Sequence, residues 1–337
     1  MLWNFLKFIT ITLGVVGFLN IFFLFNLHIK VKHSSIFYGR YDFKVEESGN
    51  SRIISDQIPM GIWTYIPAGH FGSFMSQYAT LLSLSKLNGR QAYMMSNMHD
   101  KLARVFKVRL PLLDQEVTDR MSWKLQKLHN WMSPEYRNII GEYVKLFGIV
   151  SSWTFYHDMR EEILQEFSFH DFIKDEINEY LVTIIGSTKN VTYVGVHVCR
   201  GDYIQVMLHE QKGVIDKKQY LQRAMSYFRK KYASPIFVVT SNDMDWCKEN
   251  IDNLLGDVHF AGNKTSPQRD FALLAHCNHT IMTIGSFGFW AAYLAGGETI
   301  YLTNFTDSPH QRIFKYETTY LPEWIGIPAD LLSNKNI

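Results

Sequence analysis

The chain has 337 residues, 47% of them hydrophobic and 15% aromatic, so it is long enough to bury a large core in one or two domains. Its formal net charge is only +2, with 34 lysines and arginines against 32 aspartates and glutamates, and no basic tract stands out. The electrostatic footprint of a nucleic-acid-binding protein is therefore missing.

The amino-terminal segment predicts a membrane anchor. Residues 8–25 form an apolar run, and about 18 such residues are enough for a spanning helix. A cleaved signal peptide is the alternative, but the run is longer than a usual hydrophobic region and no small-residue cleavage site follows it. We therefore expect a cytoplasmic tail over residues 1–7, a transmembrane signal-anchor over 8–27 and a stem over 28–58. Lysines flank the run on both sides, so charge does not decide its orientation.

Glycosylation sequons after this segment favour a luminal location for the body of the protein. Their asparagines are Asn190, Asn263, Asn278 and Asn304. The three cysteines allow at most one intramolecular disulfide, and burial as free thiols is equally compatible with their number.

The first half of the folded part, predicted over residues 59–186, opens as a strand, a glycine turn and a helix. The strand is expected over 61–66 and the helix over 74–87, which together begin a βαβ unit. The turn between them contains Gly69, His70, Gly72 and Ser73. Residues 98–186 are aromatic-rich and mostly helical in pattern, with the clearest amphipathic helix over 171–185.

The second half, predicted over residues 187–330, alternates strands and helices. The strands are predicted from Val191 onward and over 235–240, 257–261, 280–284 and 299–302; the helices are predicted over 216–232, 270–278 and 286–294. Alternation at this spacing indicates an α/β fold with a parallel, doubly wound sheet.

Polar side chains and glycines follow three of these strands, at the carboxyl ends where ligands bind in open α/β sheets. They are His197, Arg200 and Asp202; Ser241 and Asn242; and Gly285, Ser286, Phe287 and Gly288. Arginine can hold a phosphate through paired hydrogen bonds, and a glycine turn before a helix can present N–H groups to an anion. Two alternatives remain: an ordinary Arg–Asp surface pair, and simple capping of a buried helix by Ser286.

Four segments of the second half form a long and specific pattern. They read GVHVCRGDY (195–203), IFVVTSNDMDWCKENID (236–252), DFALLAHCNHTIMTIGSFGFWAAYLAGG (270–297) and LPEWIGI (321–327). With the opening segment at 61–90, which matches less closely, they resemble the galactoside α-1,2-fucosyltransferases of the H blood-group and secretor type, glycosyltransferase family 11. The resemblance covers most of the chain after the stem.

The resemblance implies a GT-B-like fold of two Rossmann-like halves with parallel sheets, and a Golgi enzyme whose catalytic part is luminal. It implies transfer of fucose from GDP-fucose to the 2-hydroxyl of a terminal β-galactose, with inversion and without a metal or another cofactor. Carried over to this chain, His197 and Asp270 contact the nucleoside and Arg200 the diphosphate. Ser241, Asn242 and the turn 285–288 complete the donor site, and Asp202 is the candidate general base or the partner of Arg200. The oligomeric state stays open, with a homodimer as one option.

Two departures from the family pattern leave a second hypothesis open. The family has two consecutive arginines after the histidine strand, whereas this chain has Cys199 before Arg200. The opening turn carries His70 and Ser73 in place of an arginine and an asparagine. The alternative to an active enzyme is therefore a weakly active or inactive relative that retains the fold and nucleotide or glycan binding. A nicotinamide-dependent oxidoreductase is excluded because the glycine fingerprint of its cofactor site is absent.

Overall fold

The computed structural model describes residues 61–185, 190–205, 218–261, 266–305 and 315–329, and it describes only the backbone of Ile185, Asp202 and Gln205. Within these residues, no helix combines the length and the apolar character that a membrane span requires. The predicted tail, signal-anchor and stem lie outside the described residues.

The first half contains a parallel sheet with the strand order β2-β1-β4-β3. Its strands are β1 (Ile62–Tyr65), β2 (Gln91–Ala92), β3 (Lys124–Lys127) and β4 (Val144–Phe147). The long helix α2 (Phe71–Leu87) packs against β1 and β2. The helices of this half that follow are α3 (Ser96–Leu102), α4 (Gln115–Arg120), the 3₁₀ helices η1 (Pro134–Asn138), η2 (Trp153–Phe155) and η3 (His157–Met159), then α5 (Arg160–Glu166) and α6 (Asp171–Ile185).

Helices are the main elements of residues 98–186, as the pattern predicts, but the strands β3 and β4 also lie among them and were not predicted. β3 reads Lys-Leu-Gln-Lys and is largely exposed at the edge of the sheet, so it has no apolar run that would mark it as a strand. Lysines at an edge strand also discourage pairing with another chain. β4 alternates buried and half-buried residues, but over four positions that pattern is too short to stand out.

The second half contains a six-stranded parallel sheet with the order β10-β9-β8-β5-β6-β7. Its strands are β5 (Thr192–Val198), β6 (Pro235–Ser241), β7 (Val258–Phe260), β8 (His279–Met282), β9 (Thr299–Thr303) and β10 (Ile325–Pro328). Its helices are α7 (Gly201–Gln205), α8 (Lys218–Lys231), α9 (Met244–Asn250), α10 (Pro267–Ala275), α11 (Ser286–Ala295) and α12 (Tyr316–Thr319). The predicted α/β class with parallel sheets is confirmed.

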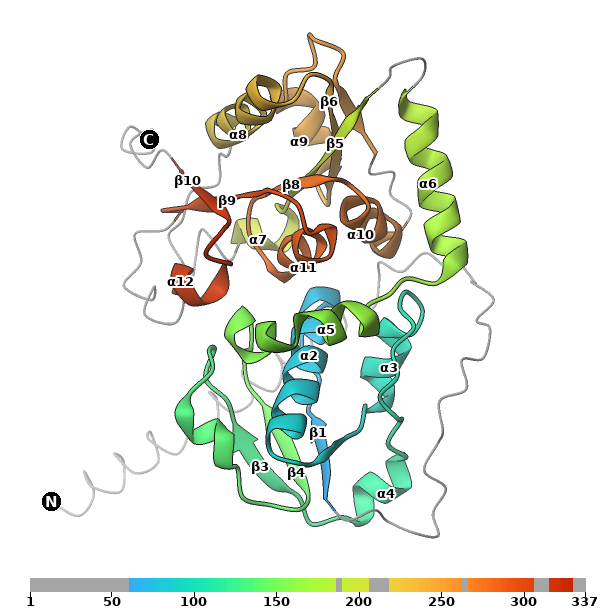
Figure 1. Ribbon diagram of the computed structural model, residues 1–337, viewed down its shortest axis with the longest axis vertical. Helices are drawn as coiled ribbons and strands as arrows, with labels where there is room; N and C mark the ends of the chain where they lie inside the picture. The colour runs from blue at the N-terminus through green and yellow to red at the C-terminus, as the bar shows by residue number, and fades with distance from the viewer. Residues whose placement is uncertain (1–60, 186–189, 206–217, 262–265, 306–314, 330–337) are drawn as a thin grey trace, which may run out of the picture. The chain divides into compact units, whose positions relative to one another are not determined.

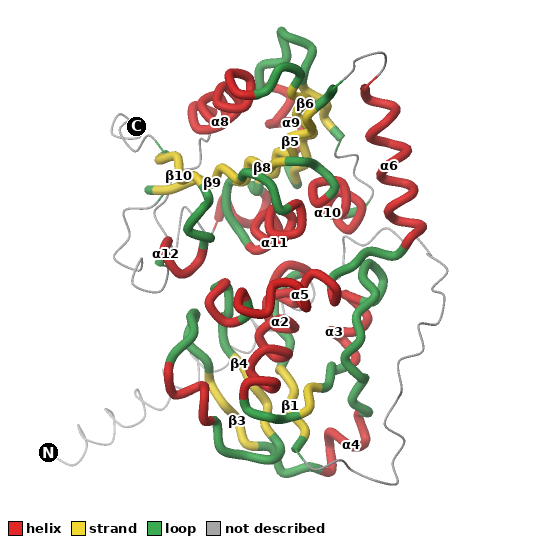
Figure 2. Tube along the Cα trace, viewed as in Figure 1, coloured by secondary structure: helices red, strands yellow, loops and turns green. Residues whose placement is uncertain are grey.

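The helices cover both faces of this sheet. Figure 1 shows α8 and α9 on one face and α10 and α11 on the other, in agreement with the two hydrophobic clusters that these helices form. Along the sheet, drawn in yellow in Figure 2, β5 to β7 follow each other toward one edge and β8 to β10 toward the other. The direction of winding therefore reverses between the neighbouring strands β5 and β8.

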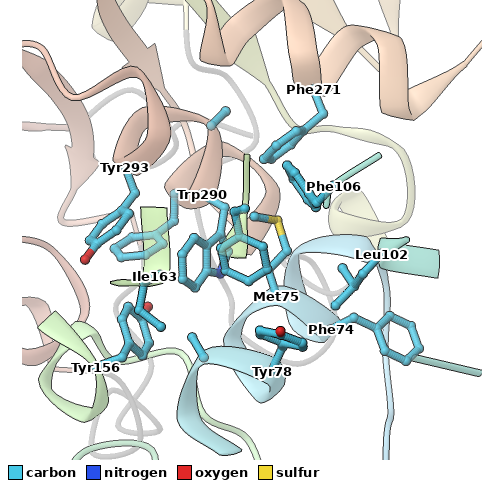
Figure 3. Close-up of a cluster of buried hydrophobic side chains, with 14 of the residues drawn as sticks. Phe74, Met75, Tyr78, Leu102, Phe106, Tyr156, Ile163, Phe271, Trp290 and Tyr293 are labelled. Atoms are coloured by element: carbon cyan, nitrogen blue, oxygen red, sulfur yellow. The ribbon is translucent and has the colours of Figure 1, made fainter. Parts of the chain in front are cut away.

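One hydrophobic cluster is continuous from the first half to the second. Figure 3 shows Met75 and Tyr78 of α2 facing Trp290 of α11, with Tyr156 and Tyr293 beside it. The indole N–H of Trp290 also donates a hydrogen bond to Ser76 Oγ at 2.8 Å. α2 and α11 thus share a core, which holds the beginnings of these two helices in place.

Candidate active site

The candidate site lies at the carboxyl edge of the second sheet, where the winding reverses. β5 pairs directly with β8, so the residues that follow these two strands emerge side by side. β5 leads to Arg200, and β8 leads to the turn 285–288. In open α/β sheets, ligands bind in the crevice at such a reversal. The structure thus brings together groups that the sequence places at separate strand ends.

The predicted turn 285–288 consists of the N-cap and the first three residues of the ten-residue helix α11. Gly285 is the N-cap with φ 95°, a conformation that favours glycine, and Ser286 is the first residue of the helix. The expectation that Ser286 caps this helix is therefore wrong: the cap residue is one position earlier and has no side chain. The arrangement still leaves the first N–H groups of α11 without partners inside the helix, as an anion site needs.

His197 and Phe287 form a stacked pair beside this turn, with ring centroids 5.0 Å apart. His197 is buried near the end of β5. A Cβ atom at Gly288 would lie only 2.7 Å from His197 Nδ1, so glycine is needed at position 288 for the imidazole to fit. This contact links the β5 end of the site to the beginning of α11.

The glycine turn of the first half reaches the same place. A Cβ atom at Gly72, in the first turn of α2, would lie 2.6 Å from the backbone N of Phe287 and from the backbone C of Ser286. The turn itself is held by Gln77, whose side chain makes two hydrogen bonds to the backbone of Ala68. The amino-terminal ends of α2 and α11 are therefore in direct contact.

We predict that Gly72→Ala disrupts this contact. Gly72 lies within a helix and needs no special backbone conformation, so the effect of the added methyl group is purely steric. We expect a loss of stability of about 1–3 kcal/mol together with weaker nucleotide binding. Thermal unfolding and a GDP titration measure the two effects, with Leu87→Ala at the exposed end of α2 as control. Wild-type behaviour of Gly72→Ala would contradict the close contact.

Arg200 is held by residues that follow β6. Its Nε donates to Asp243 Oδ2 at 2.9 Å, and its guanidinium carbon lies 4.2 Å from the ring centroid of Trp246. Its backbone N–H donates to Asn242 Oδ1 at 2.8 Å. An Arg–Asp pair does exist here, but with Asp243. Asp202 lies in α7, and its side chain is outside the described part of the structure.

Ser241 and Asn242 tie the ends of β5 and β6 together. The hydroxyl of Ser241 donates to the carbonyl oxygen of Val198 at 2.7 Å and accepts from the backbone N–H of Asp243 at 2.9 Å. Asn242 accepts from Arg200, as described above. These hydrogen bonds hold the carboxyl ends of β5 and β6 together at the site. Direct contact of either residue with a donor nucleotide remains a prediction.

Asp270 lies in the first turn of α10 and is half-buried, with its Oδ1 atom inaccessible to solvent. Burial raises its pKa to about 7, although nearby Arg269 acts in the opposite direction. No described residue donates a hydrogen bond to its Oδ1. The next residue, Phe271, contacts Phe287 with ring centroids 5.2 Å apart, which brings the beginning of α10 close to the beginning of α11. A buried carboxylate of this kind is suited to accept hydrogen bonds from a ligand.

The cysteines form no disulfide, and two of them are buried as weakly acidic thiols. Burial raises the pKa of the Cys247 thiol to about 11 and that of Cys277 to about 12. Cys199 is half-buried against the core below α8 and α9, and its backbone N–H donates to Thr283 Oγ1 at 2.9 Å. The structure therefore supports free thiols and not an intramolecular disulfide.

The acids after β6 do not gather into a metal site. Asp243 Oδ1 caps α9 by accepting from the backbone N–H of Trp246, its other oxygen binds Arg200, and Asp245 is exposed. Across the described ranges, no three histidine, cysteine, aspartate or glutamate side chains are grouped so that they could hold a metal ion. The expectation of a metal-independent protein stays a prediction.

Three of the predicted glycosylation asparagines are described, and all three are exposed: Asn190, Asn278 and Asn304. Asn278 is partly engaged, because its side-chain oxygen accepts from the backbone N–H of Tyr193. Asn263 lies outside the described residues. Glycosylation at these positions remains a prediction.

Comparison with known proteins identifies the family. Residues 42–328 match the family model of glycosyl transferase family 11. The chain belongs to this family. It is 55% identical over 280 residues to galactoside alpha-(1,2)-fucosyltransferase 1 of Oryctolagus cuniculus, a match that covers 81% of this chain and 75% of the relative. It is 53% identical over 276 residues to galactoside alpha-(1,2)-fucosyltransferase 2 of Hylobates lar, covering 80% of each. The family predicted from the motifs is confirmed.

Solved structures with a distant similarity include two fucosyltransferases. FUT1 of Arabidopsis thaliana in complex with GDP has 10% identity and a TM-score of 0.49, with 74% of this chain and 72% of that chain covered. NodZ from Bradyrhizobium has 13% identity and a TM-score of 0.46, covering 70% of this chain and 93% of that one.

The motifs of this family 11 protein left two residues of the site unrecognised. The segment 236–252 was part of the resemblance, but neither Asp243 nor Trp246 was assigned to the site from the sequence. Their contacts with Arg200 depend on how β5 lies beside β6, which no local pattern reveals. The one available signal was the pairing of neighbouring parallel strands, whose carboxyl ends lie together.

Proposed function

We propose that the protein transfers L-fucose from GDP-β-L-fucose to the 2-hydroxyl of a terminal β-galactose on glycoprotein or glycolipid glycans, forming a Fucα1-2Gal linkage with inversion. The observation that carries this proposal is membership of glycosyl transferase family 11, with relatives at 53–55% identity that are named galactoside alpha-(1,2)-fucosyltransferases. The carboxyl ends of β5 and β8, where the winding of the second sheet reverses in this GT-B-like fold, supply a location for the donor.

The chemistry needs groups that stabilise charge on the departing nucleotide. When the bond between the sugar and the phosphate breaks, negative charge builds on GDP while the sugar becomes cation-like. Arg200 and the N–H groups at the beginning of α11 are fixed in advance, so they stabilise this transition state more than the ground state. We assign Arg200, Ser286 and the glycines beside it to the diphosphate, and His197 and Asp270 to the nucleoside.

The acceptor hydroxyl needs a general base within hydrogen-bonding reach. We assign this role to Asp202, because this residue belongs to α7, which follows β5 directly at the carboxyl edge of the sheet. The turn with Gly69, His70 and Ser73 is assigned to the acceptor side. We propose no metal and no other cofactor for the reaction.

One assay tests the activity. The full chain in detergent is mixed with GDP-fucose and a β-galactoside in the presence of EDTA, and the product is examined for fucose on the 2-hydroxyl. We expect this product from the wild-type chain. No product from wild type, together with product from Cys199→Arg, would instead establish the weakly active or inactive relative.

We also propose that the chain is a single-pass type II protein of the Golgi membrane with its catalytic part in the lumen. The apolar run at 8–25 and the sequons support this arrangement. In microsomes, a carboxyl-terminal tag should be protected from added protease, and removal of N-glycans should reduce the apparent mass. A digested tag and an unchanged mass would refute the topology.

A further inference from the structure

The guanidinium of Arg200 is held on two different sides. Along one edge, Nε donates to Asp243 Oδ2 at 2.9 Å, and across its plane lies the ring of Trp246, 4.2 Å from the guanidinium carbon. Only 11% of the Arg200 side chain is exposed. An arginine held by a carboxylate and an aromatic face together has little freedom to change rotamer.

The residues that hold Arg200 are themselves fixed. Asp243 caps α9 through its second oxygen, Oδ1, which accepts from the backbone N–H of Trp246 at 3.3 Å. The backbone N–H of Asp243 is bound by Ser241, whose hydroxyl is in turn anchored on β5 at Val198. α9 packs against β6 and β7, so this end of the helix is a rigid support.

Capping of α9 alone does not account for this arrangement. One carboxylate oxygen is enough for the cap, and the second oxygen is directed to Arg200. The indole of Trp246 likewise lies over the guanidinium. Trp246 is half-buried and also packs against the hydrophobic cluster beside α8 and α9. Both side chains therefore converge on the cation that follows β5.

We propose that Asp243 and Trp246 are positioning residues that orient Arg200 for the diphosphate of the donor nucleotide. This inference rests on the proposed function, because it takes Arg200 as a diphosphate ligand. A cation that is already oriented contributes more to binding and to the transition state than a mobile one, since no freedom is lost when the ligand arrives.

Two replacements of Trp246 separate orientation from bulk. Trp246→Leu keeps an apolar side chain but removes the aromatic face, and we expect GDP binding by the full chain in detergent to weaken about tenfold. Trp246→Phe keeps an aromatic face and should stay within about threefold of wild type. Lys248→Ala, exposed on the same helix, is the control and should bind as wild type does. Wild-type binding by Trp246→Leu would overturn the proposal.

A double-mutant cycle with Arg200→Ala excludes a merely structural effect. If Trp246 acts through Arg200, then Trp246→Leu should not weaken GDP binding further once Arg200 is alanine. An equal loss in both backgrounds would show that Trp246 acts independently and would overturn the proposal. Wild-type protein without affinity for GDP would refute the proposed function itself. GDP binding that is unaffected by Arg200→Ala would overturn this inference and the assignment of Arg200 to the diphosphate, but not the proposed fucose transfer.

Asp243 offers a second arm of the same test. Asp243→Asn keeps one oxygen for the backbone N–H of Trp246, but it turns an NH2 group toward Arg200 and removes the negative charge, so α9 should stay capped while affinity for GDP falls. Asp243→Ala removes the acceptor, and affinity should fall about tenfold. The proposal is contradicted if Asp243→Ala binds GDP as tightly as wild type.

Discussion

Replacing Arg200 with alanine is expected to lower turnover by about 10²–10³-fold, because a preorganised donor to developing charge is worth about 3–4 kcal/mol. Arg200 should matter all the more in this chain because Cys199 occupies the position of the first of the two arginines in the family motif. A thiol cannot supply a guanidinium in its place. Initial rates with GDP-fucose and a β-galactoside, and a GDP titration on the same preparation, measure the effect.

Arg200→Lys serves as the companion variant. It keeps the positive charge but loses the planar fork of donors, so its turnover should fall between that of wild type and Arg200→Ala. The melting temperature of each variant controls for folding, because Arg200 is also bound to Asp243. Unchanged turnover in a folded Arg200→Ala protein would remove the diphosphate assignment.

Replacing Asp270 with asparagine should increase stability and weaken nucleotide binding at the same time. The pKa of Asp270 is raised from its ordinary value of 3.8 to about 7 by burial. Folding therefore favours the protonated form, and the stability that this group contributes is present below pH 4 and is lost as pH rises toward 7. At pH 8 the buried charge costs at most about 4 kcal/mol, and Asp270→Asn should recover part of it as a higher melting temperature.

Binding should change in the opposite direction. The N–H groups of guanine can donate hydrogen bonds to a charged carboxylate. Because Asp270 becomes charged as pH rises through about 7, the affinity of wild type for GDP should rise between pH 6 and pH 8. Asp270→Asn should bind GDP about 10–100-fold more weakly at pH 8, because a charge-assisted hydrogen bond is lost, and its affinity should no longer follow this pH change. A variant that is less stable at pH 8 and binds GDP normally would show that Asp270 has a structural role instead.

Local patterns predicted much of the second half because its elements carry their signals in short segments. β5 and β6 are apolar runs. In the first half, the amphipathic spacing of residues 171–185 likewise matches α6. α7 and β10 went unrecognised: α7 has five residues, and β10 reads Ile-Gly-Ile-Pro with alternate exposed positions. Elements this short are stabilised by their neighbours in the fold more than by their own composition.

For this protein, the sequence by itself determined the family, the alternation of strands and helices, and the strand ends at which polar groups collect. Only the tertiary structure decided that Arg200 pairs with Asp243, 43 positions along the chain, and that Gly72 touches the first residues of α11. The physical reason is that side-chain periodicity and apolar runs depend on neighbouring residues in the chain. The partners of a charge, by contrast, depend on which strands lie side by side and on how α2 packs against α11.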